Sequence, residues 1–350
     1  MLLVKIIKNI FNEKSKYFGT SQCKVSVLIP AYNHELYVEE TVRSIWDQNY
    51  PNFEIVAVDD ASGDDTFAIL EGLRKISPIP MRVYKNEVNR GPAFTLNRAA
   101  SMASGDLFIP FSSDDLFLPG RIERQVDILK NNSDLYILYC NGHGLDDSTN
   151  TRKGVCHTPH AIELLQKDAK DVYLYLITHK NCIFVHTSMI RRSLFEAVGG
   201  YDETMLAEDW SLNVKIFRYL SALPDKHYAF CDEPVFEYRV HAAQNFRNDK
   251  RQLESKWRMI ERYTPDHLKL QASNNIILGH LDAPWCRLTD TERAEQLIKL
   301  VRFHASLGEW SSVLRLCSRY VRLYPDNEDL RFLKTAAENH VHSNTDTAPH

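Results

Sequence analysis

Two adjacent carboxylates, Asp114 and Asp115, stand at the end of an apolar run that spans residues 107–111. The run is typical of a buried strand, and helical periodicity resumes at residues 121–130. In open α/β sheets ligands bind outside the carboxyl ends of the strands, where two carboxylates can hold a hard divalent cation. A solvated turn explains the same pair, because Asp is a favoured turn residue. The pair therefore predicts a cation site only if the rest of the chain supplies partners.

Three further groups of carboxylate or imidazole side chains follow separate predicted strands or helix starts: Asp59 with Asp60, Glu208 with Asp209, and His241. A metal-dependent site would explain why these groups follow so many of the predicted elements. Asp114, Asp115 and His241 together offer oxygen and nitrogen ligands, which suit Mn²⁺ or Mg²⁺ better than a metal that prefers thiolates. Asp209, at the start of a predicted helix, is a candidate general base; capping of that helix is its alternative role.

The elements that must position these groups alternate between strand and helix. Apolar runs predict strands at 25–30, 53–58, 81–84, 107–109, 135–140, 182–186 and 235–240. Helical periodicity falls between them, at 36–46, 67–73, 91–102, 121–130, 191–198 and 208–220. This alternation predicts an α/β fold with βαβ units and a mainly parallel sheet. Right-handed crossovers would gather the loops at 31–34, 59–66 and 111–116 along one rim.

The chain divides into four predicted parts. Residues 1–22 form a basic amphipathic segment, and residues 23–248 form the α/β domain, in which 142–170 reads as a long loop with a short helix. Residues 249–340 are helical, with a pair at 293–307 and 310–324 that resembles a tetratricopeptide unit. We interpret this region as a helical appendage. Residues 341–350 are polar, and we expect a disordered tail there.

Composition excludes several classes of protein. With 350 residues, 44% hydrophobic content and a formal net charge of -4, the chain has no broad positive field, so we expect no nucleic-acid partner. Its seven cysteines are scattered without a Cys-x-x-Cys element, which argues against a structural zinc site or a disulfide scaffold. Lys5 and Lys8 interrupt the apolar N-terminus, so we expect no signal peptide and a cytoplasmic protein. The predicted amphipathic helix in residues 1–22 contacts an anionic inner-membrane surface peripherally, packs on the domain or frays.

The motifs, taken in order, resemble family-2 glycosyltransferases with the GT-A fold. They are Val27-Leu28-Ile29-Pro30-Ala31-Tyr32-Asn33, Val58 through Thr66, Asn89-Arg90-Gly91-Pro92, Ser112-Ser113-Asp114-Asp115, Val198-Gly199-Gly200-Tyr201-Asp202-Glu203, Glu208-Asp209-Trp210 and Tyr238-Arg239-Val240-His241. Each motif alone is weakly specific, whereas the ordered set is strong. The resemblance covers roughly residues 23 to 245 and implies a nucleotide-sugar transferase domain followed by the helical region.

The resemblance also implies roles for individual residues. The nucleotide-sugar donor would be bound by Pro30, Ala31, Tyr32, Asp59 or Asp60, Gly91, Ser113, Asp114 and Arg239. Asp114, with Asp115 beside it, would bind Mn²⁺ or Mg²⁺ between the two donor phosphates, and His241 would complete the cation site. Asp209 would deprotonate the acceptor hydroxyl, with Glu208 orienting the helix start and Trp210 forming part of the acceptor wall.

The implied reaction is an inverting transfer of a hexosyl or N-acetylhexosaminyl group. A divalent cation stabilises the charge that develops on the departing nucleoside diphosphate, and attack from the opposite sugar face needs one base. We expect a UDP-sugar donor and a glycan or lipid-linked acceptor in cell-surface polysaccharide synthesis of the O-antigen or capsule type. Two residues depart from the family pattern. Ser112 stands where an acid is common, and Leu96 stands where many members have an arginine.

Two other functions compete with this interpretation. A non-catalytic scaffold could bind nucleotide-sugar and present the helical region to partners, but it has no need of base and cation ligands together. A nucleotidyltransferase would also combine an α/β fold with Mg²⁺. It usually carries a Gly-rich basic loop after the first strand, and Ala31-Tyr32-Asn33-His34 is not such a loop.

Overall fold

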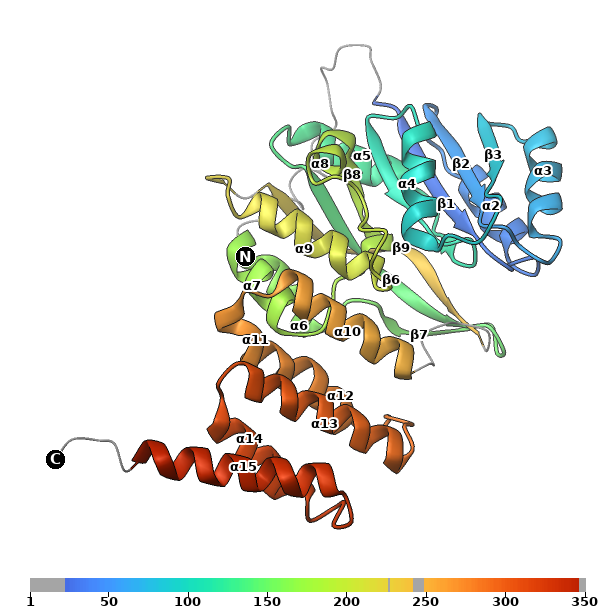
Figure 1. Ribbon diagram of the computed structural model, residues 1–350. Helices are drawn as coiled ribbons and strands as arrows, with labels where there is room; N and C mark the ends of the chain where they lie inside the picture. The colour runs from blue at the N-terminus through green and yellow to red at the C-terminus, as the bar shows by residue number, and fades with distance from the viewer. Residues whose placement is uncertain (1–22, 226, 242–248, 346–350) are drawn as a thin grey trace. The chain divides into compact units, whose positions relative to one another are not determined.

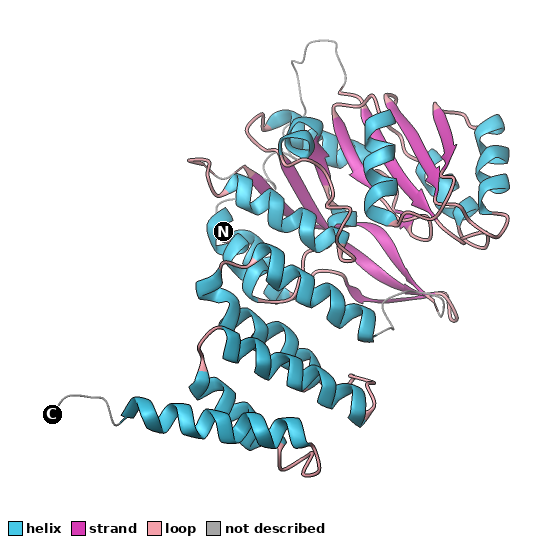
Figure 2. Cartoon of the chain, in the orientation of Figure 1, coloured by secondary structure: helices cyan, strands magenta, loops and turns pink. Residues whose placement is uncertain are grey.

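The computed structural model describes residues 23–225, 227–241 and 249–345. Two compact units divide the chain: residues 1–176 with 181–244, and residues 177–180 with 245–350. One boundary between the units falls within the undescribed segment 242–248, and the other two lie at 176/177 and 180/181. The amphipathic segment 1–22, and with it the membrane interpretation, lies outside the described residues. Figure 1 traces both units in chain order, and Figure 2 shows that the strands belong to the first.

The first unit is built on one large sheet. Its strands run in the order β3 (Met81–Lys85), β2 (Phe53–Asp59), β1 (Val25–Ala31), β4 (Leu107–Pro110), β8 (Met189–Arg191), β6 (Ile137–Asp146), β9 (Tyr228–Val240) and β5 (Leu116–Phe117). A ninth strand, β7 (Thr151–Val155), pairs with β6. Strands β1 to β4 are mutually parallel, as is the pair β6–β9. Strand β8 is antiparallel to both neighbours, and β5 and β7 are antiparallel to β9 and β6. The predicted α/β fold is confirmed.

Helices connect these strands, and α4 lies against β1 and β2 (Figure 1). The unit's helices are α2 (Val38–Trp46), α3 (Thr66–Ile76), α4 (Pro92–Met102), α5 (Arg121–Asn131), α6 (Pro159–Gln166), α7 (Ala169–Thr178, whose last two residues belong to the second unit), α8 (Arg192–Ala197) and α9 (Glu208–Leu220). The crossovers place the loops after β1, β2 and β4 at the carboxyl ends of three parallel strands, as the sequence predicts.

Two predictions within this unit are wrong. The apolar run 182–186 is no strand: Asn181 donates to the Ile183 carbonyl, a 3₁₀ turn follows at Val185–Thr187, and β8 begins only at Met189. These side-chain bonds to nearby backbone compete with a strand ladder. In the segment 142–170 the predicted short helix is present as α6, but the predicted long loop is wrong, because it holds the end of β6 and the strand β7. Strand β7 is exposed throughout, so it has no apolar alternation for a sequence to reveal.

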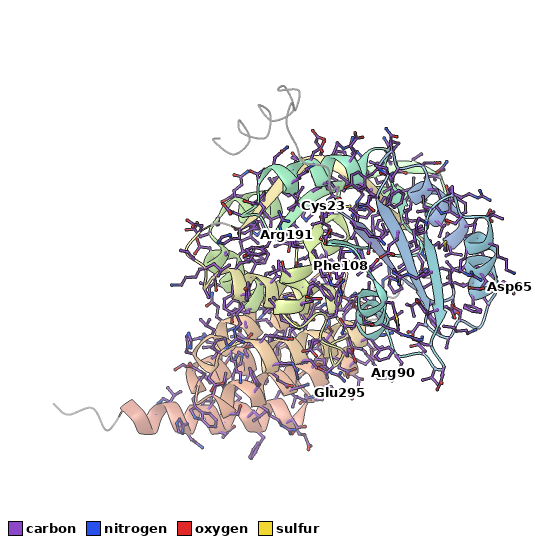
Figure 3. All side chains as sticks on the ribbon, turned by 90° about the horizontal axis from the view of Figure 1, so that it is seen from above. Cys23, Asp65, Arg90, Phe108, Arg191 and Glu295 are labelled. Atoms are coloured by element: carbon purple, nitrogen blue, oxygen red, sulfur yellow. The ribbon has the colours of Figure 1, made fainter. Side chains whose placement is uncertain are left out.

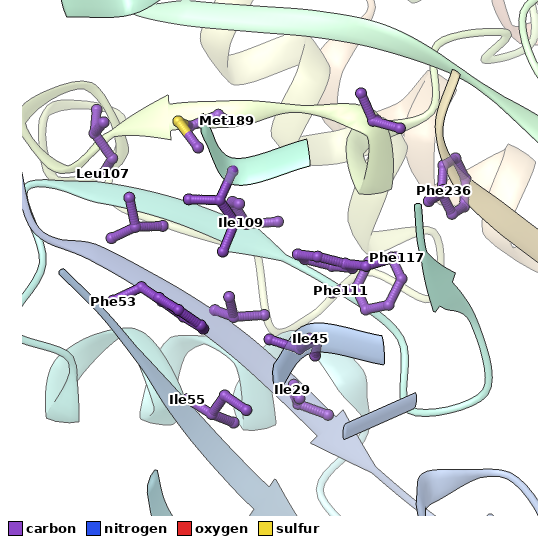
Figure 4. Packing of buried hydrophobic residues seen from close by; sticks show 14 of the residues in the cluster. Ile29, Ile45, Phe53, Ile55, Leu107, Ile109, Phe111, Phe117, Met189 and Phe236 are labelled. Atoms are coloured by element: carbon purple, nitrogen blue, oxygen red, sulfur yellow. The ribbon is translucent and has the colours of Figure 1, made fainter. Parts of the chain in front are cut away.

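The core lies between the sheet and its helices. Figure 4 shows Ile29, Ile55 and Ile109, from three neighbouring strands, packed with Ile45 of α2. In Figure 3, Phe108 is labelled within this unit and is 1% exposed, whereas Asp65 and Arg90 are exposed. Burial at about 25 cal/mol per Å² of apolar surface makes this cluster the main source of stability. It holds the strand ends, and therefore their loops, in fixed positions.

The second unit is helical. It contains α10 (Asp249–Tyr263), α11 (Asp266–Ala272), a π-helical stretch (Ser273–Leu278), α12 (Gly279–Leu281), α13 (Asp290–Ser306), α14 (Trp310–Tyr320) and α15 (Glu328–Thr345). Thr289 and Glu292 form a capping box at the start of α13. Helix α14 packs against α13 and α15. Among the described residues, no helix is long and apolar enough to cross a membrane.

The predicted disordered tail begins too early. Helix α15 continues through Thr345, and only residues 346–350 lie outside the described residues. Residues 334–342 contain good helix formers and no Gly or Pro. Ala337 is fully buried on the inner face of the helix, which gives this turn a packing partner.

Candidate functional site

Three side chains converge at the carboxyl ends of the central strands. His34 follows β1, Asp114 follows β4 and His241 follows β9. The His241 Nε2 lies 3.0 Å from the Asp114 Oδ2, and the His34 Nε2 lies 3.8 Å from the same oxygen. One potential ligand atom from each residue lies within 4.8 Å of the others. Two imidazoles and a carboxylate at this spacing fit a divalent cation such as Mn²⁺.

Neighbouring groups hold both imidazoles in place. The His34 Nδ1 lies 2.7 Å from the Ser113 Oγ, and the His34 backbone N–H donates to Thr66. The His241 ring packs on Tyr37, with ring centroids 4.5 Å apart and planes inclined by 31°. Partners on the ring nitrogen that faces away from a metal fix the orientation of the imidazole. Ser113, predicted to bind donor, is therefore placed to orient His34.

The pKa shifts of His34 and Asp114 favour the forms of these two side chains that bind a cation. Burial lowers the pKa of His34 below its ordinary value, so its ring stays neutral and keeps a lone pair at neutral pH. Burial alone would raise the pKa of Asp114, but the hydrogen bond with His241 lowers it below its ordinary value. Asp114 is therefore an anion between two imidazoles.

Asp115 does not join this cluster, although the sequence predicts it as a cation ligand. Its side chain is fully buried, and its Oδ1 accepts the backbone N–H of Arg239 at 2.9 Å. Its Oδ2 has no hydrogen-bond partner, and burial together with the Asp114 carboxylate raises its pKa well above the ordinary value. Asp114 and Asp115 therefore have different partners. His34 provides the third group of the cluster, where the sequence predicts Asp115.

Arg239 holds in place the loop that carries Asp114. Its Nε donates to the Asp114 carbonyl at 2.8 Å, its Nη1 to Asp147 at 2.8 Å and its Nη2 to Glu40 at 2.5 Å. These two carboxylates raise its pKa against the effect of burial. Arg239 was predicted to lie beside the donor diphosphate. Its guanidinium is instead committed to protein groups, and its contribution to donor binding stays a prediction.

The acidic pair after β2 has two distinct environments. Asp60 accepts from Asn86 and Arg90 through Oδ1 and from the Gly91 backbone at 2.7 Å through Oδ2, so it shapes the loop that opens α4. Gly91 has a φ of 85°, which favours glycine. Asp59 accepts from the Ser62 N–H, but its buried Oδ1 has no hydrogen-bond partner. Of the two, Asp59 has the open acceptor for a ligand.

The loop after β1 lies at the same edge of the sheet. Pro30 and Ala31 are in β1 itself, and Ala31 is buried. Tyr32 is 43% exposed, which leaves much of its ring available to a bound base or ribose. The Asp60 N–H donates to the Ala31 carbonyl at 2.8 Å, so the ends of β1 and β2 are joined. Donor binding by these residues stays a prediction.

Asp209 stands at the start of α9, beside Glu208 in the first turn. Its Oδ1 accepts the Trp210 N–H at 2.7 Å, and its Oδ2 accepts from the Asn181 side chain at 3.0 Å. Burial raises the pKa of Asp209 above its ordinary value. The group thus contacts the helix start, as a capping role requires, and has the raised basicity that suits a general base.

The Trp210 indole points into the interior of the protein. It is 4% exposed, and its Nε1 donates to the Leu176 carbonyl in α7 at 2.8 Å. The sequence predicts an acceptor wall from this ring, but the buried position leaves little of it to contact a glycan. Trp210 fixes the start of α9, and with it Asp209.

The Tyr238 hydroxyl is affected by the charges of the Asp114–Asp115 pair and of Asp209. Burial raises the pKa of its hydroxyl, and the charges of Asp115, Asp114 and Asp209 all raise it further. The phenol therefore lies within electrostatic reach of both the candidate cation site and the candidate base. The cation cluster and Asp209 lie in the same unit of the chain.

The two departures from the family pattern have structural counterparts. Leu96 is buried, and the neighbouring Arg98 donates to the Lys85 carbonyl and to Asn86. The arginine of α4, Arg98, is therefore bonded to other groups of the protein.

Asn97 accepts a hydrogen bond from the Tyr201 N–H and donates one to the Tyr201 carbonyl, and these bonds hold the motif loop that precedes α9. Ser112 is half-buried next to Ser113.

Sequence reasoning missed His34 and Asn181 as site residues. His34 carries a readable signal, because it follows a predicted strand at the rim where the carboxylates also gather. Asn181 carries none, since its contact with Asp209 depends on the loop that replaced the predicted strand.

Comparisons with known proteins agree with this geometry. Residues 26–199 match the family described as "Glycosyl transferase family 2". An uncharacterized glycosyltransferase of Rickettsia prowazekii is 31% identical over 233 residues, which cover 66% of this chain and 68% of the relative. The Escherichia coli UDP-Glc:alpha-D-GlcNAc-diphosphoundecaprenol beta-1,3-glucosyltransferase WfgD is 34% identical over 110 residues, 31% of this chain and 42% of that protein.

A solved structure shares the fold. S. aureus TarS 1-349 in complex with UDP-GlcNAc superposes with a TM-score of 0.60 at 18% sequence identity, covering 91% of this chain and 92% of that one. At this identity the likeness concerns the fold. The family match and the Rickettsia relative show that this chain belongs to glycosyl transferase family 2.

Proposed function

We propose that the protein is an inverting, cation-dependent glycosyltransferase that moves a hexosyl or N-acetylhexosaminyl group from a UDP-sugar. The observation that carries the proposal is the cluster of His34, Asp114 and His241 at the carboxyl ends of the strands, with Asp209 in the same unit. UDP-linked donors appear in the names of WfgD and of the TarS complex, which supports this choice of nucleotide.

His34, Asp114 and His241 would hold Mn²⁺ or Mg²⁺. The fit rests on two imidazole nitrogens and a carboxylate oxygen, which lie within 4.8 Å of one another. When bound, the cation supplies charge stabilisation for the departing nucleoside diphosphate without proton transfer. Ser113 orients His34, and Arg239 fixes the Asp114 backbone.

Asp209 would accept the proton of the acceptor hydroxyl. Each of its oxygens already accepts one protein hydrogen bond, and each keeps a second lone pair. The acceptor oxygen then bonds to the anomeric carbon while the bond to the donor phosphate breaks, and the proton goes to Asp209. Attack opposite the leaving group inverts the anomeric centre, so an α-linked donor gives a β-linked product.

We propose a glycan or lipid-linked acceptor in cell-surface polysaccharide synthesis. The named acceptor of WfgD is a sugar on diphosphoundecaprenol, and its product linkage is β. A cytoplasmic enzyme attached peripherally to the inner membrane face through residues 1–22 would meet such an acceptor. That attachment rests on the basic amphipathic spacing of the segment.

A nucleotide-release assay with the full-length protein tests the proposal. UDP- and GDP-linked sugars are incubated with Mn²⁺, with and without a diphospholipid-linked monosaccharide. Acceptor-dependent release of UDP, lost in Asp209→Asn, is the expected result. Donor binding without release under every condition would instead identify a non-catalytic binding protein.

A further inference from the structure

A second group of metal-ligating side chains lies in the helical unit, apart from the residues assigned to glycosyl transfer. Asp249 begins α10, His280 lies in α12, and Cys286 lies in the segment that leads to α13. One potential ligand atom from each lies within 4.8 Å of the others. All three belong to the second unit. The candidate site at the sheet contains no thiol, so the two clusters differ in chemistry.

The cluster is largely shielded from solvent and has an unsatisfied nitrogen. His280 is 2% exposed and Cys286 is 8% exposed. The His280 Nε2 has no hydrogen-bond partner, although it lies 3.3 Å from the Asp249 Oδ1. The contact between this nitrogen and the carboxylate does not meet hydrogen-bond geometry, and a divalent ion between the two atoms would bind both of them.

The surrounding contacts hold the ligand segment in place before any ion binds. The Asp249 Oδ2 accepts the Arg287 backbone N–H at 2.7 Å, which leaves Oδ1 for a ligand. Arg293 donates to the Leu281 carbonyl at 2.5 Å and to the Cys286 carbonyl at 3.2 Å. These bonds hold the start and the middle of the segment between α12 and α13, so its binding groups lose little conformational entropy when an ion binds.

From these observations we propose that Asp249, His280 and Cys286 bind a zinc-type divalent ion. Thiolate, imidazole and carboxylate are the three ligand types that Zn²⁺ accepts. The thiolate makes Mg²⁺ and Ca²⁺ poor occupants, because they require oxygen ligands. Three protein ligands leave a fourth tetrahedral position for solvent. The ion would join the start of α10 to the segment before α13.

Lys256 sets how tightly the ion is held. Its ammonium contacts the His280 Nδ1. An ion on Nε2 requires the ring proton on Nδ1, and metal-bound imidazoles usually donate that proton to an acceptor. An ammonium group donates only, and its charge repels the ion. Glutamine at position 256 would offer an amide oxygen to the same nitrogen, so Lys256→Gln should bind the ion roughly 10- to 100-fold more tightly.

Titration of the chelator-stripped full-length protein with Co²⁺ tests the proposal. Co²⁺ substitutes for Zn²⁺, and ligation by a thiolate produces a charge-transfer absorption that a site without sulfur cannot give. We expect one equivalent of this absorption in the wild-type chain, its loss in Cys286→Ser, and its retention in Cys317→Ser. Cys317 is the matched control, a buried thiol in α14 of the same unit.

Further variants keep the test decisive if Cys286→Ser does not fold. Asp249→Asn preserves an acceptor for the Arg287 N–H but removes the anionic ligand, so it should weaken Co²⁺ binding while far-ultraviolet circular dichroism stays unchanged. Absence of the absorption in the folded wild type, its persistence in Cys286→Ser, or unchanged affinity in both Asp249→Asn and Lys256→Gln would overturn the proposal. Zn²⁺ should displace Co²⁺, and the variants should rank in the same order for Zn²⁺ affinity as for Co²⁺ affinity.

Discussion

The two ends of the parallel strands bury carboxylates in opposite ways. Near the amino end of β2, Glu54 is 3% exposed and accepts hydrogen bonds from Ser26, Ser104 and Arg82. At the carboxyl ends, Asp59 and Asp115 each keep a buried oxygen with no hydrogen-bond partner. A fully satisfied buried carboxylate stabilises the fold, whereas an under-satisfied one is available to a ligand.

The pKa values of Glu54 and Asp115 differ in the same way as their hydrogen bonding. For Glu54, burial alone would raise the pKa, but hydrogen bonds from Ser26 and Ser104 and the charge of Arg82 lower it to about 2. Burial raises the pKa of Asp209, and burial with a neighbouring carboxylate raises that of Asp115. Perturbed carboxylates cluster where function needs them. The comparison assigns stability to the amino end of the sheet and chemistry to the carboxyl end.

Removal of the Asp114 carboxylate should give the largest effect on activity. Asp114→Asn keeps the size of the side chain but removes the charge between the two imidazoles. Turnover should fall on the order of 10³-fold or more, since cation stabilisation contributes several kcal/mol to the transition state. The measurement is UDP release at saturating donor. A variant that keeps the wild-type response to Mn²⁺ would place the cation elsewhere.

Asp209→Asn should have the next largest effect, with a different signature. Loss of a general base typically lowers the rate by ~10²–10⁴-fold, while UDP affinity, measured by calorimetry, should stay within a few-fold. Glu208→Gln is the milder control from the same helix turn. Near-normal turnover, or loss of UDP binding in proportion to rate, would leave Asp209 with its capping role alone.

His34→Ala should raise the Mn²⁺ concentration needed for half-maximal activity. The variant removes one of three ligands and leaves Asp114 and His241 in place. A shift of roughly 10- to 100-fold is expected, and Ser113→Ala, which loses only the group orienting His34, should shift it less. Unchanged Mn²⁺ dependence in His34→Ala would restore Asp115 as the better candidate for the third ligand.

Glu54→Gln should leave turnover per folded molecule nearly unchanged but lower stability. The folded pKa of about 2 lies below the unfolded value of 4.5, so the carboxylate stabilises the fold fully above pH 4.5. That contribution, on the order of 3 kcal/mol from the difference in pKa, is lost as the pH falls toward 2. Urea unfolding should show a deficit at pH 7 that narrows in acid. A deficit independent of pH would argue that packing, not charge, is responsible.

The parallel half of the sheet was predictable from the sequence for a physical reason. Strands buried on both faces are nearly continuous apolar runs, as in Val25–Ala31 and Phe53–Asp59, and amphipathic helices separate them. Strand β7 lacks a buried face, and the 182–186 segment is turned by side-chain bonds to its own backbone. Neither feature produces a periodic pattern of apolar residues from which it could be predicted.

The candidate site was predictable to the level of clusters but not of single atoms. Asp114 and His241 lie together as the motif order implies, because parallel strands bring their carboxyl ends to one edge. Which of two adjacent aspartates faces the cluster depends on local backbone direction. The Arg239 partners Asp147 and Glu40 come from segments distant in sequence, so no local pattern could reveal that its guanidinium is already engaged.

Chelation of the wild-type enzyme tests the central claim most directly. The rate of UDP release is measured with a competent donor and acceptor, first in excess chelator and then as Mn²⁺ is restored. If His34, Asp114 and His241 hold the cation that the transfer requires, the rate should fall to background and return with Mn²⁺. Full turnover in excess chelator would contradict the assignment of a cation-dependent site to the carboxyl ends of these strands.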